Sequence, residues 1–437
     1  MKNILLFGAG KSATSLIAYL GKCSDENDWK FVVCDSDLDL VKSKIIGFKN
    51  AVAKSINVTE EVNRHELIEQ ADIVISMLPA ALHFLVAKDC VLFSKNLLTA
   101  SYIDDSIQSL EKEIVEKNLL FIGEMGLDPG IDHMSAMKMI HKIKKEGGKI
   151  LSFKSHCGGL VAPESDDNPW HYKITWNPAN VVSAGSSGAS FLKNNEVVQI
   201  PYKEIFAHEE NVVDIPDLGP LAFYANRDSL NYIDTYDMKG IQTFIRTTLR
   251  YPAFNKGWDI LVNAGFTSKD DFEFVKDCKT FNEWFQLKMN QWGGFSKTNR
   301  ESEFMEQVDF LGMRNDELIP AGMKNSAGIL QYLLENSLIM KPDDKDMIVM
   351  LHELDYEIGG MKKNLIGSLI VKGKDQLHTA MAQTVGLPLG IAAKLILQNQ
   401  IHLTGLHIPV VEEIYNPVLK ELAQNGIQFS EFEKDIS

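Results

Sequence analysis

The sequence predicts an α/β protein: a doubly wound parallel sheet joined to an α+β domain with a helical insertion. Two observations lead to this fold class. In the first third of the chain, short apolar runs of strand length alternate with segments of helical length, which is typical of a parallel sheet covered on both faces. From about residue 149, strand-like runs follow one another without regular helices between them.

Six runs of strand length divide the first third of the chain: NILLFGA, KFVVCD, NAVAKSINV, DIVISMLP, NLLTASYI and NLLFIGEMG. Segments of helical length lie between them, among them KSATSLIAYLGK, AALHFLVAKDCVLF and SIQSLEKEIVEKN. Six such strands fit a complete doubly wound dinucleotide fold, so residues 1–128 are predicted to form that domain.

The patterns beyond this domain are more mixed. The strand-like runs KILSFKSHC, HYKITWN, VVQIPY and LAFYANRD come first, and residues 241–340 are mostly helical in pattern. Residues 347–373 are typical of a β-meander with a Gly-Gly turn. In the final helix-rich part, Gly386 and Pro388 are expected to kink or break the helix.

The composition restricts the partners. The chain has 437 residues, which suggests two or three domains, and its formal net charge of −15 argues against nucleic acid. The short basic run HKIKKEGGK is interpreted as a solvated helix face. No stretch reaches the roughly 18 consecutive apolar residues of a membrane helix, and early glycines interrupt any signal-peptide core. Five cysteines without a C-x-x-C pair indicate reduced thiols and a cytoplasmic location.

A glycine motif follows the first predicted strand. In FGAGKSA, Gly8, Gly10 and Ala13 have G-x-G-x-x-A spacing at the start of a helix. The first glycine permits a tight turn, the second lets the backbone approach a pyrophosphate, and the small third residue allows close helix–strand packing. A glycine-rich turn without a ligand is the alternative, but the surrounding order of strands and helices favours a Rossmann-type dinucleotide site.

Asp35 ends the second strand, where an acidic side chain accepts hydrogen bonds from the adenosine ribose and repels a 2′-phosphate. No Arg or Lys occupies positions 34–41, so NAD is favoured over NADP. Capping of the next helix is the alternative role for Asp35, although Ser36 and Asp37 are equally suited to it. The expected cofactor contacts in the loop and at the strand ends are Gly8, Ala9, Gly10, Lys11, Ser12, Ala13, Asp35, Ser36, Asn57, Val58, Ser76 and Leu78.

Candidate substrate-binding groups lie outside this domain. The stretch SHCGGLVAPESDDNPWHYK concentrates Cys157, Lys173 and other polar residues, and Arg227 and Arg250 follow it. Arginines suit a substrate rich in carboxylates because the guanidinium pairs with them bidentately. Each arginine alone is more often part of a surface or structural ion pair. Adjacent His156 and Cys157 have no recognised metal-ligand spacing, so no metal is expected.

The stretch GLDPGIDH, residues 126–133, places polar residues around a turn made by Pro129 and Gly130. Asp132 directly precedes a helix-like stretch and is assigned to N-capping. Asp128 lies at the carboxyl end of the sixth strand and is the preferred site carboxylate. His133 stays open between a structural and a proton-handling role.

Several motifs together resemble the saccharopine dehydrogenase family, in its L-glutamate-forming branch (saccharopine reductase). They are GLDPGIDHMSAMKMI, SHCGGLVAPESDDNPWHYKITW, YANRDS, RTTLRYPAF and MAQTVGLPLGIAAKLIL, and they follow the order of the family across nearly the whole chain. The resemblance implies reversible NAD(P)-dependent interconversion of saccharopine with glutamate and 2-aminoadipate 6-semialdehyde, in lysine metabolism. It also implies a homodimer, a Rossmann domain to which roughly residues 385–437 return, an α+β substrate and dimerisation domain (129–240 and 341–384), and a helical domain (241–340).

The resemblance also assigns site residues. Leu127 and Asp128 would border the nicotinamide, and the implied substrate contacts, with Lys173 from the motif, are Ser101, Tyr102, Asp128, Lys173, Arg227, Thr248, Leu249 and Arg250. The chain departs from the family at Val161, Trp170, His171 and Ala225, which leaves a modified substrate open. It also lacks an arginine near Asp35 that NADP-dependent members have, which supports NAD.

The implied reaction needs a group that stabilises a protonated imine. Asp128 is the first candidate, and His133 and Cys157 are weaker ones. A carboxyspermidine or carboxynorspermidine dehydrogenase is an alternative enzyme, although a polyamine would favour an acidic site over two arginines. A nucleotide-binding regulatory protein without catalysis is an alternative of another class.

Overall fold

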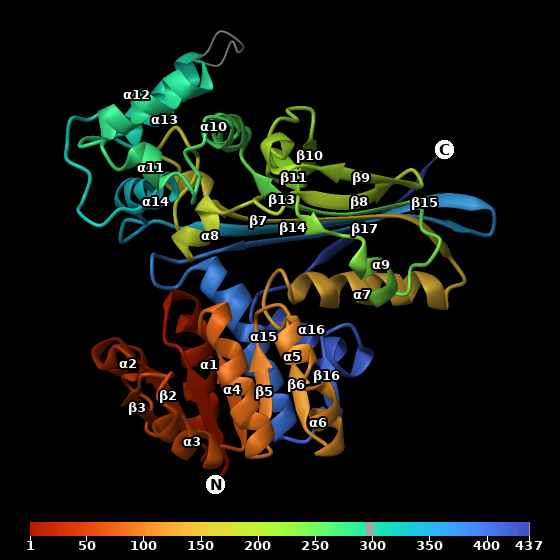
Figure 1. Cartoon of the computed structure of the whole chain (residues 1–437). Coiled ribbons are helices and arrows are strands. Elements are labelled where there is room, and N and C mark those ends of the chain that lie inside the picture. The colour runs from red at the N-terminus through yellow and green to blue at the C-terminus, as the bar shows by residue number, and fades with distance from the viewer. Residues whose placement is uncertain (294–300, 437) are drawn as a thin grey trace. The chain divides into compact units, whose positions relative to one another are not determined.

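The computed structural model describes residues 1–293 and 301–436 (Figure 1). The chain divides into two compact units. The first comprises Met1–Glu146 with Leu377–Ser430, and the second comprises Gly147–Gln376 with the residues from Glu431 onward. The three-domain division expected from the sequence stays a prediction.

The first unit contains a seven-stranded parallel sheet in the order β16-β6-β5-β4-β1-β2-β3. Its strands are β1 (Asn3–Phe7), β2 (Lys30–Asp35), β3 (Ala51–Ser55), β4 (Ile73–Ser76), β5 (Asn96–Thr99), β6 (Leu120–Ile122) and β16 (Gly405–His407). The order reverses between β1 and β4, so the predicted doubly wound sheet is confirmed. The six predicted strands are present, and β16 extends the sheet from the C-terminal part of the chain.

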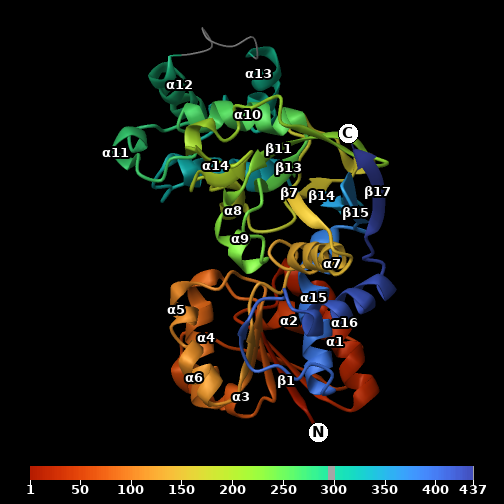
Figure 2. The same ribbon diagram turned by 90° about the vertical axis from the view of Figure 1, so that its right-hand side faces the viewer.

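Most helices of the first unit cover this sheet, whereas α7 packs against α16 (Figure 2). The helices of this unit are η1 (Lys11–Ala13), α1 (Thr14–Asn27), α2 (Leu38–Ile45), α3 (Glu61–Glu69), α4 (Ala80–Leu92), α5 (Asp105–Gln108), α6 (Glu111–Glu116), α7 (Ile131–Lys145), α15 (Ala380–Leu397) and α16 (Glu412–Gln424). The central strands are apolar along their whole length because both of their faces are buried, as the burial of Ile4, Leu5 and Leu6 shows.

Helix α15 lies against α1 and runs without interruption through Pro388. A break at Gly386 and Pro388, one of the two expected outcomes, therefore does not occur. The two glycines of α15 are explained by packing: a Cβ on Gly386 would lie 3.0 Å from the backbone nitrogen of Leu16, and one on Gly390 would lie 2.8 Å from the ring of Tyr19. By length and composition α15 is long and apolar enough to cross a membrane, but 83% of it is buried inside the protein, as in a core helix.

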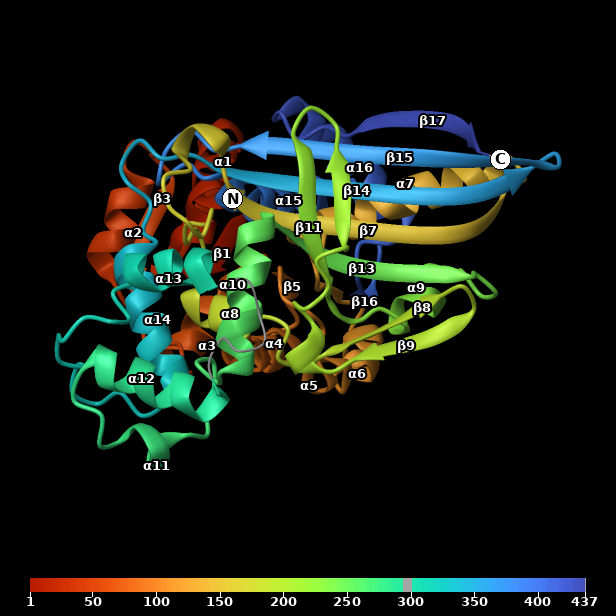
Figure 3. The ribbon, with the colours of Figure 1, turned by 90° about the horizontal axis from the view of Figure 1, so that it is seen from above.

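The second unit contains a ten-stranded mixed sheet (Figure 3). Its main path is β10-β11-β13-β7-β14-β15-β17. Beside this path, β8 pairs with β13, and β9 and β12 both pair with β8. The strands are β7 (Lys149–Val161), β8 (Ala189–Lys193), β9 (Glu196–Ile200), β10 (Val212–Ile215), β11 (Gly219–Ala225), β12 (Arg227–Asp228), β13 (Thr243–Arg250), β14 (Asp346–Ile358), β15 (Met361–Lys372) and β17 (Ser430–Ile436). The predicted Gly-Gly turn is confirmed, because Gly359 and Gly360 join β14 to β15.

A group of helices packs beside this sheet around a core of large aromatic residues, including Trp170, Trp258 and Trp284. The helices of this unit are η2 (Pro163–Ser165), α8 (Pro178–Val182), η3 (Tyr202–Glu204), α9 (Asn231–Thr235), α10 (Pro252–Asn263), α11 (Phe272–Val275), α12 (Phe281–Trp292), α13 (Glu301–Phe310) and α14 (Ser326–Ser337). Helix α10 directly follows β13, so the sheet and the helical core share one chain segment.

The glycine contact between α15 and α1 yields a stability prediction. Gly386→Ala places a methyl group against the backbone of α1 and is expected to lower the free energy of unfolding by about 1–3 kcal/mol. Urea unfolding followed by circular dichroism measures this change. Gly328→Ala in α14 is the matched control, because its Cβ meets only side-chain atoms, the nearest at 3.3 Å. Equal stability of the two variants would contradict the packing role of Gly386.

Candidate cofactor and substrate sites

The glycine loop between β1 and η1 has the conformation that its motif predicts. Gly8 has a φ of 99°, and a Cβ there would lie 2.7 Å from the carbonyl oxygen of Met77, so only glycine fits beside the end of β4. Gly10 is exposed, and no atom lies within 4 Å of the position of its Cβ. Ala13 is buried at the start of the helix. The loop therefore presents open backbone at Gly10, which fits the approach of a pyrophosphate.

The carboxylate of Asp35 is hydrogen-bonded to the backbone of the glycine loop. Its Oδ2 accepts a 2.7 Å hydrogen bond from the backbone N–H of Ala9, and its Oδ1 accepts from the N–H of Asp37 at 3.2 Å. The cap of α2 is Asp37, whose carboxylate accepts from the N–H of Leu40 at 3.0 Å. The capping alternative for Asp35 is therefore wrong. Asp35 lies at the loop, where the ribose of a dinucleotide binds in such folds.

His83 connects the carboxyl ends of two strands of the parallel sheet and was not among the residues that the sequence predicted for the site. Its Nδ1 lies 2.8 Å from the Oγ of Ser76 at the end of β4, and its Nε2 lies 2.8 Å from the Oγ of Ser101 just beyond β5. Burial lowers the pKa of His83 to about 4, against the opposing effect of Asp104, so the imidazole is neutral at pH 7. The available signal was a histidine in the first turn of the helix that follows SMLP.

The GLDPGIDH stretch forms a tightly closed loop before α7. The Asp128–Pro129 peptide is cis, and a Cβ on Gly130 would lie 2.1 Å from the carbonyl oxygen of Gly126. The expected N-cap role of Asp132 is wrong in detail: Gly130 is the N-cap residue, and Asp132 lies within the helix. From there its Oδ1 accepts from the N–H of Gly130 at 2.6 Å, because its carboxylate points back to the loop.

The polar residues of this loop differ in exposure. His133 is 0% exposed, and its Nε2 lies 2.8 Å from Oε2 of Glu124. Asp132 is also buried, whereas Asp128 is partly exposed. Burial favours a structural role for His133 and leaves Asp128 as the accessible carboxylate. A catalytic role for either residue stays a prediction.

In the second unit, Arg250 is a buried cation without a counter-ion among the residues that the structure describes. The residue is 5% exposed, and its Nη1 donates to the carbonyl oxygen of Leu249 at 2.7 Å. Its guanidinium lies 5.3 Å from the ring centroid of Tyr172 and 5.5 Å from that of Phe254. Within residues 1–293 and 301–436, its Nε has no hydrogen-bond partner and no carboxylate forms an ion pair with it. Such an arrangement suits an anionic ligand, because a buried charge needs compensation.

The neighbours of Arg250 on β13 divide between the two faces of the sheet. Thr248 is in register with Cys157 of β7, so these two residues lie beside one another, with Arg250 two residues further along β13. Leu249 points the other way into an apolar core, which leaves only its backbone for a ligand. Arg227 is exposed on β12 and has a φ of 51°. The substrate roles of these residues, like those of Ser101 and Tyr102, stay predictions.

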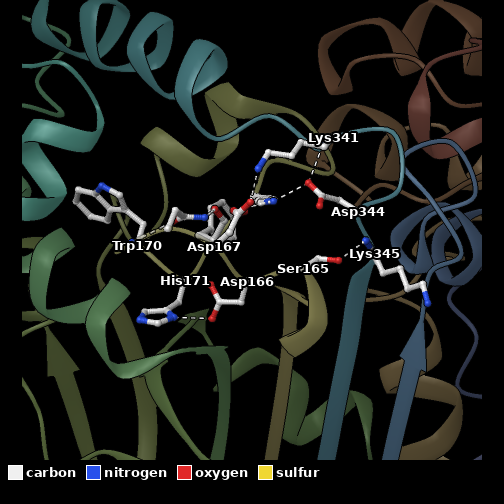
Figure 4. Close-up of polar contacts among 11 residues, drawn as sticks. Ser165, Asp166, Asp167, Trp170, His171, Lys341, Asp344 and Lys345 are labelled. Carbon is white, nitrogen blue, oxygen red and sulfur yellow. Dashed lines mark hydrogen bonds and ion pairs between the residues drawn. The ribbon is translucent and has the colours of Figure 1, made fainter.

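Lys173 differs from Arg250 because it is fully paired. It is 3% exposed, and its Nζ lies 2.6 Å from Oδ2 of Asp344 and 2.8 Å from Oδ1 of Asp167. Hydrogen bonds from Lys173 and Lys341 hold the pKa of Asp167 at about 2. Figure 4 shows Asp167, Lys341 and Asp344 of this network, in which Lys341 also pairs with Asp167. The contacts favour a structural role for Lys173 over the predicted substrate role.

The four positions at which the chain departs from the family motif all belong to the second unit. Trp170 is buried, donates from Nε1 to the carbonyl oxygen of Gln307 at 3.0 Å, and packs edge-on against Phe254 and Trp258. His171 places Nδ1 2.5 Å from Oδ2 of Asp166 (Figure 4). Val161 and Ala225, the other two departures, are buried. Trp170 therefore belongs to the aromatic core beneath Arg250.

Together, the doubly wound sheet, the open glycine loop and the contact of Asp35 with that loop fit a Rossmann-type dinucleotide-binding domain. The chain belongs to the saccharopine dehydrogenase family. Residues 126–427 match the model of the saccharopine dehydrogenase C-terminal domain, and residues 4–122 match that of the saccharopine dehydrogenase NADP binding domain.

Individual relatives agree with this assignment. Over 98% of the chain, it is 33% identical to the mitochondrial alpha-aminoadipic semialdehyde synthase of Rattus norvegicus, of which it covers 47%. The chain thus spans about half the length of the rat protein and of similar mammalian relatives. It is 31% identical to the saccharopine dehydrogenase [NADP(+), L-glutamate-forming] of Saccharomyces cerevisiae, over 98% of this chain and 99% of that one. The structure of apo saccharopine dehydrogenase (L-Glu forming) from the same yeast superposes with a TM-score of 0.89, at 29% identity and full coverage of both chains.

The paired state of Lys173 yields a prediction. Lys173→Met removes the cation from the buried carboxylate of Asp344 and is expected to lower the free energy of unfolding by about 3–5 kcal/mol. Chemical denaturation measures the change. Lys341→Met, which removes an exposed partner of Asp167, is the control and is expected to have little effect. A stable Lys173→Met variant with a raised KM for substrate would instead support the substrate role.

Proposed function

We propose that the chain is an NAD(P)-dependent saccharopine dehydrogenase of the L-glutamate-forming type. The single observation that carries the substrate class is Arg250, a buried guanidinium with aromatic neighbours and no carboxylate partner in the described part of the chain. Saccharopine has three carboxylates, and a carboxylate would supply the missing counter-charge. The family membership and the yeast relative's printed activity support the particular substrate.

The proposed reaction oxidises the carbon–nitrogen bond of a secondary amine. NAD(P)⁺ would accept the hydride from the carbon beside that nitrogen. Loss of the hydride leaves a protonated C=N bond, water then adds to the iminium carbon with release of a proton, and the C–N bond breaks to give glutamate and 2-aminoadipate 6-semialdehyde. The reverse direction condenses these two products and reduces the imine.

The residues of the chain have separate proposed roles. The backbone at Gly10 and the carboxylate of Asp35 would hold the pyrophosphate and the adenosine ribose, with NAD favoured by the charge of Asp35. Asp128, the partly exposed carboxylate of its loop, would stabilise the cationic iminium or hold an ammonium group of the substrate. His133 is a weaker candidate because its imidazole is engaged by Glu124. A homodimer and a cytoplasmic location are also part of this proposal.

The alternative functions have less support. A carboxyspermidine or carboxynorspermidine dehydrogenase would bind a polycationic chain, for which an uncompensated buried guanidinium is unfavourable. A regulatory protein that binds only a nucleotide would not explain the buried guanidinium of Arg250, because no second ligand would supply its counter-charge. The comparison of substrates in one assay separates all three functions.

The decisive measurement is the absorbance of reduced cofactor with purified protein. Saccharopine with NAD⁺ is expected to give turnover, with glutamate and the aldehyde as products in equal amounts. Turnover with a carboxylated polyamine and none with saccharopine would reject the proposed substrate. Nucleotide binding without turnover on either compound would favour the regulatory alternative.

Arg250 provides a test that separates binding from stability. Arg250→Met is expected to raise the KM for saccharopine by about 100-fold, because a charge-assisted hydrogen-bond pair is lost. The same change is expected to leave the free energy of unfolding within about 1 kcal/mol, since the guanidinium has no counter-ion to lose in the described part of the chain. Steady-state kinetics and urea unfolding measure the two quantities. Arg314→Met, at an exposed arginine of the same unit, is the control, and an unchanged KM in Arg250→Met would remove Arg250 from the site.

A further inference from the structure

Lys44, near the end of α2, directs its ammonium group to the glycine loop. Its Nζ donates to the carbonyl oxygen of Gly10 at 2.7 Å and to Oγ1 of Thr14 at 2.9 Å. Gly10 belongs to the loop after β1, and Thr14 is the first residue of α1. The charged end of this lysine therefore lies beside the second glycine of the motif, where the proposed cofactor approaches the backbone.

Asp35 contacts the same loop one residue earlier, at the backbone N–H of Ala9. A carboxylate and an ammonium group thus contact consecutive residues of the loop. Burial lowers the pKa of Lys44 to about 8, and the negative charge of Asp35 acts in the opposite direction. The lysine is therefore mostly protonated at pH 7 and lies within electrostatic range of Asp35.

The ammonium group retains capacity for a further acceptor. A lysine has three N–H donors, and Gly10 and Thr14 use two of them. Among the residues that the structure describes, no third acceptor is found for Lys44. A phosphate oxygen is a strong acceptor for such a donor, because the hydrogen bond is assisted by both charges.

We propose that Lys44 is a specificity-determining residue that binds the 2′-phosphate of NADP, so that the chain accepts NADP as well as NAD in spite of Asp35. This inference rests on the proposed dinucleotide site. In such folds the acidic residue after the second strand binds the ribose 2′-hydroxyl of NAD, and a nearby cation accommodates the 2′-phosphate of NADP. Lys44 supplies that cation from α2, and it offsets the repulsion between Asp35 and the phosphate.

The sequence-based preference for NAD depended on the absence of Arg and Lys from positions 34–41. Lys44 lies outside that window, two helical turns beyond Asp37, but its side chain reaches the loop. Lys42 lies closer in sequence, yet it is exposed and its Nζ lies 3.7 Å from Asp39 of the same helix. The two lysines therefore form a matched pair for comparison.

The test is fluorescence titration of the full chain with NADH and with NADPH, in the absence of any substrate. Lys44→Met is expected to weaken NADPH binding by about tenfold or more and NADH binding by less than about threefold. Lys44→Arg keeps the charge and is expected to retain most of the NADPH affinity. Lys42→Met is the control and is expected to change neither affinity.

Three outcomes would overturn the role of Lys44. These are equal losses for the two nucleotides in Lys44→Met, an unchanged NADPH affinity, and a wild-type protein that binds NADH but not NADPH. NADH binding by each variant also reports that the loop is folded. A wild-type protein that binds neither nucleotide would reject the dinucleotide site itself, which distinguishes failure of the proposed function from failure of this inference.

Discussion

The first unit depends on close backbone approach around the beginning of α1. Gly8 lets the chain turn beside the end of β4, and Gly386 brings α15 to within contact of the backbone at Ser12 and Leu16. The glycine loop is therefore held from two sides, by a neighbouring strand and by a helix from the C-terminal part of the chain. A loop that must present its backbone N–H groups to a phosphate gains from such support, because it has few side chains of its own to pack.

The elements of this unit could be predicted because their signals are local. A strand buried on both faces is a continuous apolar run, and the β1 sequence NILLF is one. The return of β16 to the edge of the sheet has no such signal, because the three residues Gly405–His407 are too short to be recognised alone. At Pro388 the local signal is misleading, because proline prefers to end a helix. Burial of α15 against α1 overrides this preference.

The site was only partly predictable, since sequence identifies residue types but not their partners. Lys173 and Arg250 were both plausible ligands for a carboxylate. The structure shows that Lys173 already has two carboxylate partners, whereas Arg250 has none within the described ranges. His83 was missed for a related reason: its importance comes from the two strand ends that it joins, and neither hydroxyl is adjacent to it in sequence.

Charge compensation connects these observations. A buried charge without a partner costs stability, and folded proteins retain it only where something else binds it. Among the basic side chains considered above, Lys173 has its counter-ions within the fold, and Lys44 has neutral acceptors with a carboxylate in electrostatic range. Arg250 has a carbonyl oxygen and two aromatic rings, which orient the guanidinium but do not neutralise it. In the proposed function a carboxylate of the substrate would complete this arrangement, and the packing of Trp170 against Phe254 supports the aromatic surface on which Arg250 lies.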